Sequence, residues 1–289
     1  MAFNPNAVFI SPSSLADFEK CPQLYYYRNV FRKPNGLKIQ IINPPLALGQ
    51  AVHDTLEQFL KLIPAERNKE ELLKMLEIVW SNLKDEKGGY VSETEEKEYH
   101  EKAVLMLERF WKHEHFKTAE KFKIPDFPKV ELGNDLILTG KLDWIEKDND
   151  TYHLIDFKTG KNEEREDSKQ LPIYAVLISN ILGSSNIKTS YWYLDHDDEL
   201  TSAPFGNIEE TTKDLTQRGN ILKLVRQTNS FRCKSGGESC WACKDMLAVA
   251  KGKGKLVSVD YSRKQEIYIL PKDPRKSTSK MEIPEGLPF

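Results

Sequence analysis

The stretch LILTGKLDWIEKDNDTYHLIDFKTGKNEEREDSKQLPIY, residues 136–174, decides the fold of this chain. Large aliphatic residues recur over 136–145, and β-branched and aromatic residues return over 151–158. The polar residues 147–150 between the two runs are typical of a tight turn, so the pattern predicts an antiparallel hairpin. Because side chains alternate along a strand, we expect Asp156 and Lys158 to share one face while Phe157 points into the core.

Two acidic side chains and a lysine are predicted to meet at the end of this hairpin. The carboxylates of Asp143 and Asp156 offer the oxygen ligands that Mg²⁺ prefers, and bound Mg²⁺ keeps waters that a substrate phosphate can replace. Lys158 can orient or deprotonate the attacking water and stabilise phosphate charge. Taken alone, a D-x-K pattern also describes an ordinary exposed ion pair, so the residues around the hairpin have to decide between the two interpretations.

Three motifs in the stretch resemble those of the PD-(D/E)XK nuclease superfamily, and specifically its RecB-like branch. They are a G-x-x-D, a D-x-K and a Q-x-x-x-Y pattern, found at Gly140–Asp143, Asp156–Lys158 and Gln170–Tyr174. That branch includes the CRISPR-adaptation nucleases and the AddB-type iron–sulfur helicase-nucleases. The resemblance implies an α/β fold with a mixed central β-sheet flanked by helices, the restriction-endonuclease-like core.

The resemblance also implies roles for the motif residues. Asp143, Asp156 and Lys158 would be catalytic, with the two acids holding Mg²⁺ or Mn²⁺. Gln170 and Tyr174 are four positions apart and so share a helical face, from which the resemblance implies contact with DNA or the active site.

A histidine is the third candidate metal ligand. Residues 46–63 have the apolar periodicity of an amphipathic helix, and His53 lies at the edge of its apolar stripe. A lone histidine there is more often a hydrogen-bonded core residue than a ligand. However, Gly49-x-x-x-His53 resembles the motif whose histidine completes the metal site in this family, and with two acids present we favour His53 as a ligand.

The four cysteines of the chain predict a second metal site. Cys240 and Cys243 form a C-x-x-C pair, Cys233 lies seven residues upstream, and Cys21 stands near the amino terminus. Four thiolates can hold zinc or a 4Fe–4S cluster, whereas a redox pair lacks the βαβ context that it needs. The segment around Cys21, SPSSLADFEKCPQLYYYR, resembles the amino-terminal signature of RecB-like nucleases. We therefore favour a 4Fe–4S cluster that links the two ends of the chain, with zinc as the alternative.

The remaining apolar patterns predict mostly helices around the core. Helices are expected over most of 66–122 and over 209–227, and a strand over 188–194. Leu105 and Ile221 are among the residues expected to face inward. Residues 66–122 form a helical insertion relative to a minimal nuclease of this kind.

We expect a single nuclease domain over residues 1–250, followed by a tail over 251–289 that is basic and then Pro-rich. The predicted parts of the domain are an N-terminal arm with Cys21 (1–45), a helical part (46–125), the catalytic core (126–200), and a helix with a Cys-rich closure (201–250). The tip of the tail, 282–289, is acidic and apolar like segments that dock partner proteins, but ordinary terminal disorder is the favoured interpretation.

Composition sets the limits within which these motifs act. With 289 residues and 39% hydrophobic residues the chain can bury a substantial core, as one large domain or two small ones. No apolar run reaches the ~18–20 residues of a membrane span, and the amino terminus does not have the pattern of a signal peptide, so we expect a cytoplasmic protein. The formal net charge of −2 gives no indication of DNA binding. Local basic patches, however, matter more for DNA binding than the net charge does.

The function that these observations favour is a metal-dependent DNA nuclease. By the resemblance, it would act as an exonuclease on single-stranded DNA or duplex ends in DNA repair, recombination or CRISPR adaptation. Its partners would be DNA and a helicase, recombination or CRISPR-adaptation protein. The alternative from another class is a subunit that binds DNA ends without cutting them. A type II-style restriction enzyme is less favoured, because the Gln170–Tyr174 helix and the cysteines point elsewhere.

Overall fold

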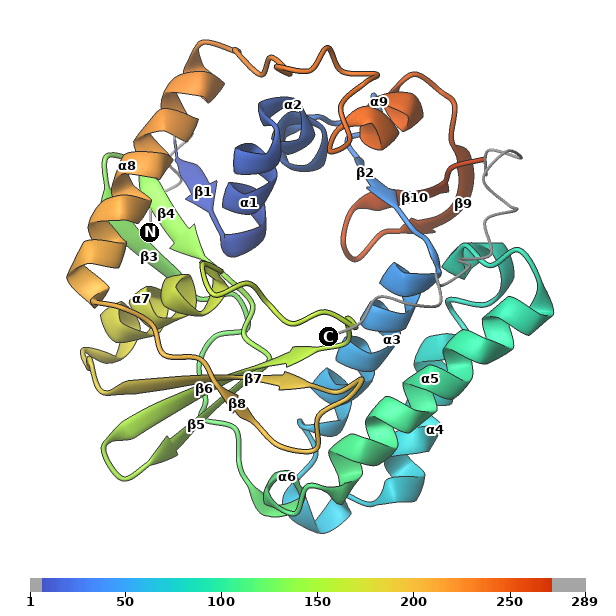
Figure 1. The fold of residues 1–289 in the computed structure, drawn as a ribbon, viewed down its shortest axis with the longest axis vertical. Coiled ribbons are helices and arrows are strands. Elements are labelled where there is room, and N and C mark those ends of the chain that lie inside the picture. Colours follow the sequence, from blue (N-terminus) through green and yellow to red (C-terminus); the bar gives the residue numbers. More distant parts are fainter. Residues whose placement is uncertain (1–6, 272–289) are drawn as a thin grey trace, which may run out of the picture.

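A computed structural model describes residues 7–271 of the chain. The acidic and apolar tip at 282–289 lies outside the described residues. In the described part, mixed β-sheets are flanked by helices, which confirms the expected fold class (Figure 1). No helix among residues 7–271 is long and apolar enough to cross a bilayer.

The sheet that carries the motif residues has the strand order β5-β6-β7-β8. Its strands are β5 (Trp144–Asp148), β6 (Thr151–Lys158), β7 (Ile187–Tyr193) and β8 (Thr201–Ser202). The hairpin of β5 and β6 is antiparallel as predicted, and Asn149 adopts a positive φ of 51° in its turn. Strand β7 is parallel to β6, which requires a crossover helix, and β8 is antiparallel to β7.

The prediction of one strand over 136–145 is wrong in part. The chain forms β4 (Leu136–Thr139) in a separate sheet of order β1-β4-β3, with β1 (Val8–Ile10) and β3 (Lys129–Gly133). It then leaves that sheet through Gly140–Asp143 and enters β5. Gly140 makes this bend possible because a Cβ there would lie 2.7 Å from the ring of Tyr174, so only glycine fits without displacing the ring.

Helices cover both faces of the motif sheet. Ile155 and Phe157 of β6 pack into a core with α3 (Pro44–Phe59), α4 (Lys69–Trp80) and α5 (Glu93–Lys112). Leu154 packs on the opposite side, in a core with α7 (Gln170–Leu182) and α8 (Ile208–Gln227). Phe157 thus points to the core as predicted, and Asp156 lies on the face toward α7.

Caps and short helices complete these layers. Ser11 forms a capping box with Ser14 at the start of α1 (Pro12–Lys20). Helix α7 instead begins after Lys169 without a side-chain cap and ends at Gly183 in the left-handed conformation. The shorter helical segments are α2 (Pro22–Tyr25), the π-turn Tyr26–Val30, the 3₁₀ turns Pro64–Glu66 and Asp85–Gly88, α6 (His115–Thr118) and α9 (Lys244–Ala250).

A small sheet joins the two ends of the described chain. Strand β10 (Gln265–Ile269) pairs parallel with β2 (Lys38–Ile41) and antiparallel with β9 (Lys255–Asp260). The first part of the predicted tail therefore adds two strands to the folded molecule. Figure 1 shows this sheet beside α3, with α9 next to it.

Candidate active site

His53 and Asp143 meet although 90 positions separate them in the sequence. Helix α3 presents His53, whose Nδ1 lies 3.2 Å from Oδ1 of Asp143, just before β5. The other oxygen of Asp143 accepts a hydrogen bond of 3.0 Å from the backbone N–H of Phe157. Asp143 therefore links α3 to β6 through both of its carboxylate oxygens.

Helix α3 comes this close to the hairpin because of Gly49. A Cβ at Gly49 would lie 3.2 Å from the hydroxyl oxygen of Thr159, which follows the D-x-K motif. Gly49 is one helical turn before His53, so the close approach of the backbone and the direction of the histidine follow from the same G-x-x-x-H spacing.

Asp156, Lys158 and Gln170 form a second group of hydrogen-bonded side chains. Lys158 Nζ lies 2.9 Å from Oδ2 of Asp156 and donates to Oε1 of Gln170 at 2.6 Å. The amide of Gln170 in turn donates to Oδ1 of Asp156 at 2.7 Å. Asp156 and Lys158 share a face of β6 as predicted, and Gln170, from the first turn of α7, closes the triangle.

Tyr174 lies one turn further along α7 and is buried. Its ring packs against Gly140, the first residue of the G-x-x-D motif. The three motifs are therefore in mutual contact, but the exposed surface of Tyr174 is only 7%, which leaves little of the ring for direct contact with a ligand.

Two charged residues of this region were not singled out in the sequence. Glu164 places Oε1 3.0 Å from Lys158 Nζ, and its backbone N–H donates to the hydroxyl of Tyr193 at 3.0 Å. Lys121 donates to the main-chain oxygens of Leu142 at 3.2 Å and Asp143 at 2.7 Å, and so supports the chain that carries Asp143. Both come from segments without periodicity, where a single charge gives no signal.

Electrostatics in the site follows from burial and from the proximity of the two acids. Burial lowers the pKa of His53, but the charge and hydrogen bond of Asp143 outweigh it and raise the pKa to about 9. Burial raises the pKa of Asp143, but the charge and hydrogen bond of His53 outweigh it, so the net direction is down. Burial and the nearby charge of Asp143 raise the pKa of Asp156 to about 7, against the opposing effect of Lys158.

Lys158 is held in its charged form. Burial lowers its pKa, but the charge and hydrogen bond of Asp156, with further contributions from Glu164, raise it above its ordinary value. A lysine held this way at neutral pH donates hydrogen bonds and provides positive charge, and it does not accept a proton.

The donor set of His53, Asp143 and Asp156 suits a hard divalent cation. Two carboxylates and an imidazole are ligands that Mg²⁺ and Mn²⁺ accept. Burial and the nearby charge of Asp143 raise the pKa of Asp156, and a bound cation would offset both effects. In the described structure the donor atoms of these residues are not all within 4.8 Å of one another. Asp143 bonds His53, while Asp156 bonds Lys158 and Gln170.

The four cysteines do come together. The Sγ atoms of Cys21, Cys233, Cys240 and Cys243 all lie within 4.8 Å of one another, and within residues 7–271 no other set of three or more such donors is this compact. All four are free thiols, and all but Cys233 are buried. The N–H groups of Gly237 and Ser235 hydrogen bond the Cys233 sulfur and lower its pKa to about 7, which favours the thiolate at this position. Burial raises the pKa of Cys21 and Cys243 in the metal-free site. The set can bind a metal.

The geometry agrees with a comparison against known families. A sequence model of the PD-(D/E)XK nuclease superfamily matches residues 10–244 of the chain. The protein therefore belongs to the PD-(D/E)XK nuclease superfamily, and this membership indicates a metal-dependent nuclease. No curated protein matches the chain.

Proposed function

We propose that the protein is a Mg²⁺- or Mn²⁺-dependent deoxyribonuclease of the RecB-like kind. The observation that carries the proposal is the meeting of His53 with Asp143, and of Asp156 with Lys158 and Gln170, at one edge of the motif sheet in a chain of this superfamily. The other interpretation of the D-x-K pattern, an ordinary exposed ion pair, does not fit Asp156, because this residue is only 4% exposed.

In this proposal His53, Asp143 and Asp156 hold the cation. The chemistry that a bound divalent cation supplies is polarisation of the phosphoryl oxygen and stabilisation of the leaving oxygen. Lys158 donates a hydrogen bond that orients the attacking water, and its positive charge stabilises the developing negative charge on the phosphate. Gln170 hydrogen bonds both Asp156 and Lys158 and so holds the two side chains in fixed positions relative to each other.

Tyr174 and Glu164 hold the catalytic groups in place. The ring of Tyr174 fixes the bend at Gly140 that leads to Asp143, and Gln170 presents its amide from the same helix. Glu164 is the second carboxylate on Lys158, so it limits the positions that the lysine can take. By family analogy the substrate is single-stranded DNA or a duplex end in repair, recombination or CRISPR adaptation, with a helicase, recombination or adaptation protein as partner.

At the cysteine site we propose a metal that links the two ends of the chain. The sequence favours a 4Fe–4S cluster with zinc as the alternative. The sulfur atoms all lie within 4.8 Å of one another. This limit accommodates the ~3.8 Å separations around one tetrahedral ion with Zn–S bonds of about 2.3 Å. Colour separates the two, because a cluster gives brown protein with broad visible absorbance after anaerobic purification, and zinc gives a colourless protein with stoichiometric metal.

The test of the proposed activity is cleavage of 5′- and 3′-labelled single-stranded and duplex DNA with Mg²⁺ or Mn²⁺. We expect Lys158→Ala and Asp156→Ala each to lower the rate roughly a thousandfold, because the first removes a positive charge at the reacting phosphate and the second removes a ligand of the cation. Binding of the same DNA, measured in Ca²⁺, should change by only a few-fold.

A matched control is Lys147→Ala, which removes an exposed lysine from the same hairpin and should leave cleavage unchanged. Tight binding of DNA ends by the wild-type protein without cleavage in either metal would instead establish the alternative, a non-cleaving subunit that binds DNA ends.

A further inference from the structure

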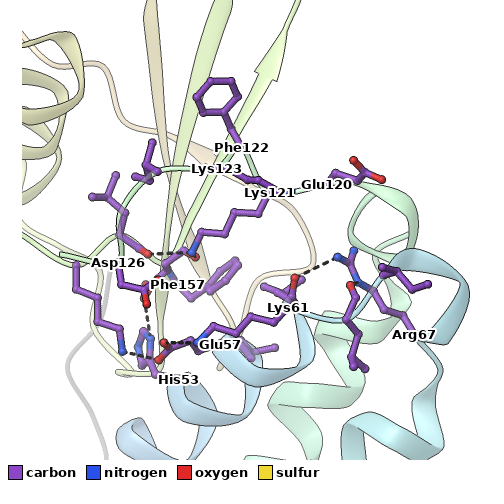
Figure 2. Close-up of a pocket in the computed structure, with 18 of the residues that line it drawn as sticks. His53, Glu57, Lys61, Arg67, Glu120, Lys121, Phe122, Lys123, Asp126 and Phe157 are labelled. Atoms are coloured by element: carbon purple, nitrogen blue, oxygen red, sulfur yellow. Dashed lines mark hydrogen bonds and ion pairs between the residues drawn. The ribbon is translucent and has the colours of Figure 1, made fainter. Parts of the chain in front are cut away.

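A cavity of about 460 Å³ opens beside the Asp143 side of the site. His53 and Asp143 line it, whereas Asp156, Lys158 and Gln170 do not. Figure 2 shows His53, Glu57 and Lys61 along one side, from α3 and the turn after it, with Lys121 and Lys123 opposite them. The volume lies in the lower part of the range for small-ligand pockets, about 300–1,000 Å³, and suits one nucleotide-sized group.

The inner wall of the cavity is apolar and preformed. Leu56 of α3 and Leu60, just after it, line this wall with Leu142, just before β5, and Phe157 of β6. None of these side chains is more than 6% exposed. Side chains this well packed keep their positions, so the wall does not have to be assembled when a ligand binds. An apolar wall of this kind accepts a sugar and base, which have apolar faces, and not a charged backbone.

Three lysines, Lys61, Lys121 and Lys141, line the cavity near the candidate metal ligands, where Glu57 and Asp126 are further acids of the lining. Lys121 lies there, with its Nζ on the main-chain oxygens of Leu142 and Asp143. Lys61 and Lys141 both pair with Glu57, so that this carboxylate is more than neutralised. A phosphate at this end of the cavity, its mouth, would lie near these lysines and near His53 and Asp143, the residues that would hold the cation in the proposed function.

The opposite end has no comparable place for phosphate. Arg67 closes it, and four hydrogen bonds from its guanidinium are already given to the carbonyls of Leu60, Leu62, Phe116 and Ala119. Glu120 lies on the same side, away from His53, with an exposed carboxylate (Figure 2). A phosphodiester backbone that continued past this end would meet a negative charge and an arginine with little hydrogen-bonding capacity left.

We infer that this cavity, the nucleotide pocket, binds the terminal nucleotide of a DNA strand, with the adjoining scissile phosphate at the mouth. The inference rests on the proposed function and deepens it, because a pocket with one phosphate-compatible mouth selects a strand end. Cleavage at the mouth releases the nucleotide in the pocket by hydrolysis of one P–O bond, with water supplying the OH to phosphorus and the proton to the leaving oxygen. The product is a mononucleotide.

The test uses substitutions that fill the nucleotide pocket and measures the length of the DNA products. Ile124→Trp and Ile63→Trp add bulk from two positions that line it, and Ile78→Trp, at a 56% exposed position on α4, is the matched control. With wild type and control we expect linear labelled single strands to give mononucleotides and a closed circle of the same sequence to be cut at least 100-fold more slowly. Each pocket variant should release mononucleotides at least tenfold more slowly, with unchanged thermal unfolding.

A binding measurement separates this inference from the proposed activity. Thymidine 5′-monophosphate and thymidine 3′-monophosphate are titrated by equilibrium dialysis in Ca²⁺, which requires no cleavage. One isomer should bind wild type at least tenfold more tightly than it binds the pocket variants, and that isomer gives the polarity. Equal cutting of circles, or equal nucleotide affinity in wild type and both variants, would overturn the pocket. Absence of cleavage with every DNA would overturn the proposed activity alone, and the dialysis would still decide the pocket.

Discussion

At the scale of single residues, the pairs His53–Asp143 and Asp156–Lys158 have different roles in the site. The first pair connects helix α3 to the hairpin, and the second holds positive charge against a buried acid. Both contain protons or cations that compete with a divalent metal for the same oxygen and nitrogen atoms. Metal binding should therefore depend strongly on pH.

We expect the affinity for Mn²⁺ to rise with pH, because bound metal requires deprotonated ligands. With the pKa of His53 at about 9, affinity should increase about tenfold per pH unit between pH 7 and 9. Below pH 7 the slope should steepen, because Asp156, with a pKa of about 7, is then protonated as well. The measurement is a calorimetric titration between pH 6 and 9.5, with proton release determined in buffers of different ionisation enthalpy.

The control for this pH dependence is His53→Gln, which keeps a polar side chain but has no titrating proton. Its affinity should be lower at pH 9 and nearly independent of pH between 7 and 9. An affinity of the wild-type protein that stays flat over the same interval would show that His53 does not contribute to the metal site. In the metal-free fold the dependence has the opposite sign: the stabilisation from the His53–Asp143 attraction is lost as the pH rises through about 9.

At the scale of elements, the three motifs meet because glycines allow backbones and rings to approach. Gly49 lets α3 approach Thr159, and Gly140 lets the chain bend beneath the ring of Tyr174. Figure 1 shows the result: α7 lies on one side of the motif sheet and α3 on the other, with the end of β6 between them. The position of Asp143 therefore depends on residues that carry no charge.

We expect Gly140→Ala to destabilise the protein by about 1–3 kcal/mol and to lower cleavage, because the added Cβ would lie 2.7 Å from the Tyr174 ring. Combining it with Tyr174→Leu should recover part of the loss, which a double-mutant cycle of urea unfolding measures. Gly206→Ala is the control, since a Cβ there meets nothing within 4 Å and its φ is not positive. Additive effects of Gly140→Ala and Tyr174→Leu would contradict this packing argument.

The elements also show how far sequence reasoning extends. The β5–β6 hairpin, helix α3 and helix α8 were predicted because their periodicities are strong and local. The strand over 136–145 was predicted wrongly, because a run of aliphatic residues does not reveal that it passes from one sheet to another at Gly140. Leu105 and Ile221 were expected to face inward but are 61% and 56% exposed, since a helical stripe leaves its edges ambiguous.

In the candidate site, too, the sequence predicts residues that belong to short local motifs and misses residues whose contacts depend on the fold. Gly49 and His53, the acids and Gln170 could be found because short motifs fix their spacing, although their roles stay predictions. Glu164 and Lys121 were missed because each is one charge in an irregular segment, and only the fold shows what it touches. The parallel pairing of β2 with β10 joins residues far apart in the sequence, and nothing local to either strand announces it.

At the scale of the whole molecule, the two ends of the described chain are joined at several places. The cysteines bring Cys21 to Cys233 and its neighbours, more than 200 positions away. Strand β10 pairs with β2 in the small sheet. One guanidinium nitrogen of Arg263 donates to both carboxylate oxygens of Asp54, next to His53 on α3. The site and the joined ends therefore share helix α3 but no ligand residues.

This arrangement predicts that the metal at the cysteine site stabilises the fold without taking part in the chemistry. Closing a loop of this length contributes about 5 kcal/mol at most to the free energy of unfolding. The other links between the ends would preserve part of this contribution when the metal is lost. Cys240→Ser should then lower the unfolding temperature by roughly 5–15 °C, while cleavage at 20 °C in Mg²⁺ falls less than threefold. Lys158→Ala is the reciprocal control, with normal unfolding and a full metal content at the cysteines but no cleavage. If Cys240→Ser stayed folded at 20 °C and yet lost cleavage as completely as Lys158→Ala, the cysteine metal would belong to the catalytic machinery and the separation of the two sites would be wrong.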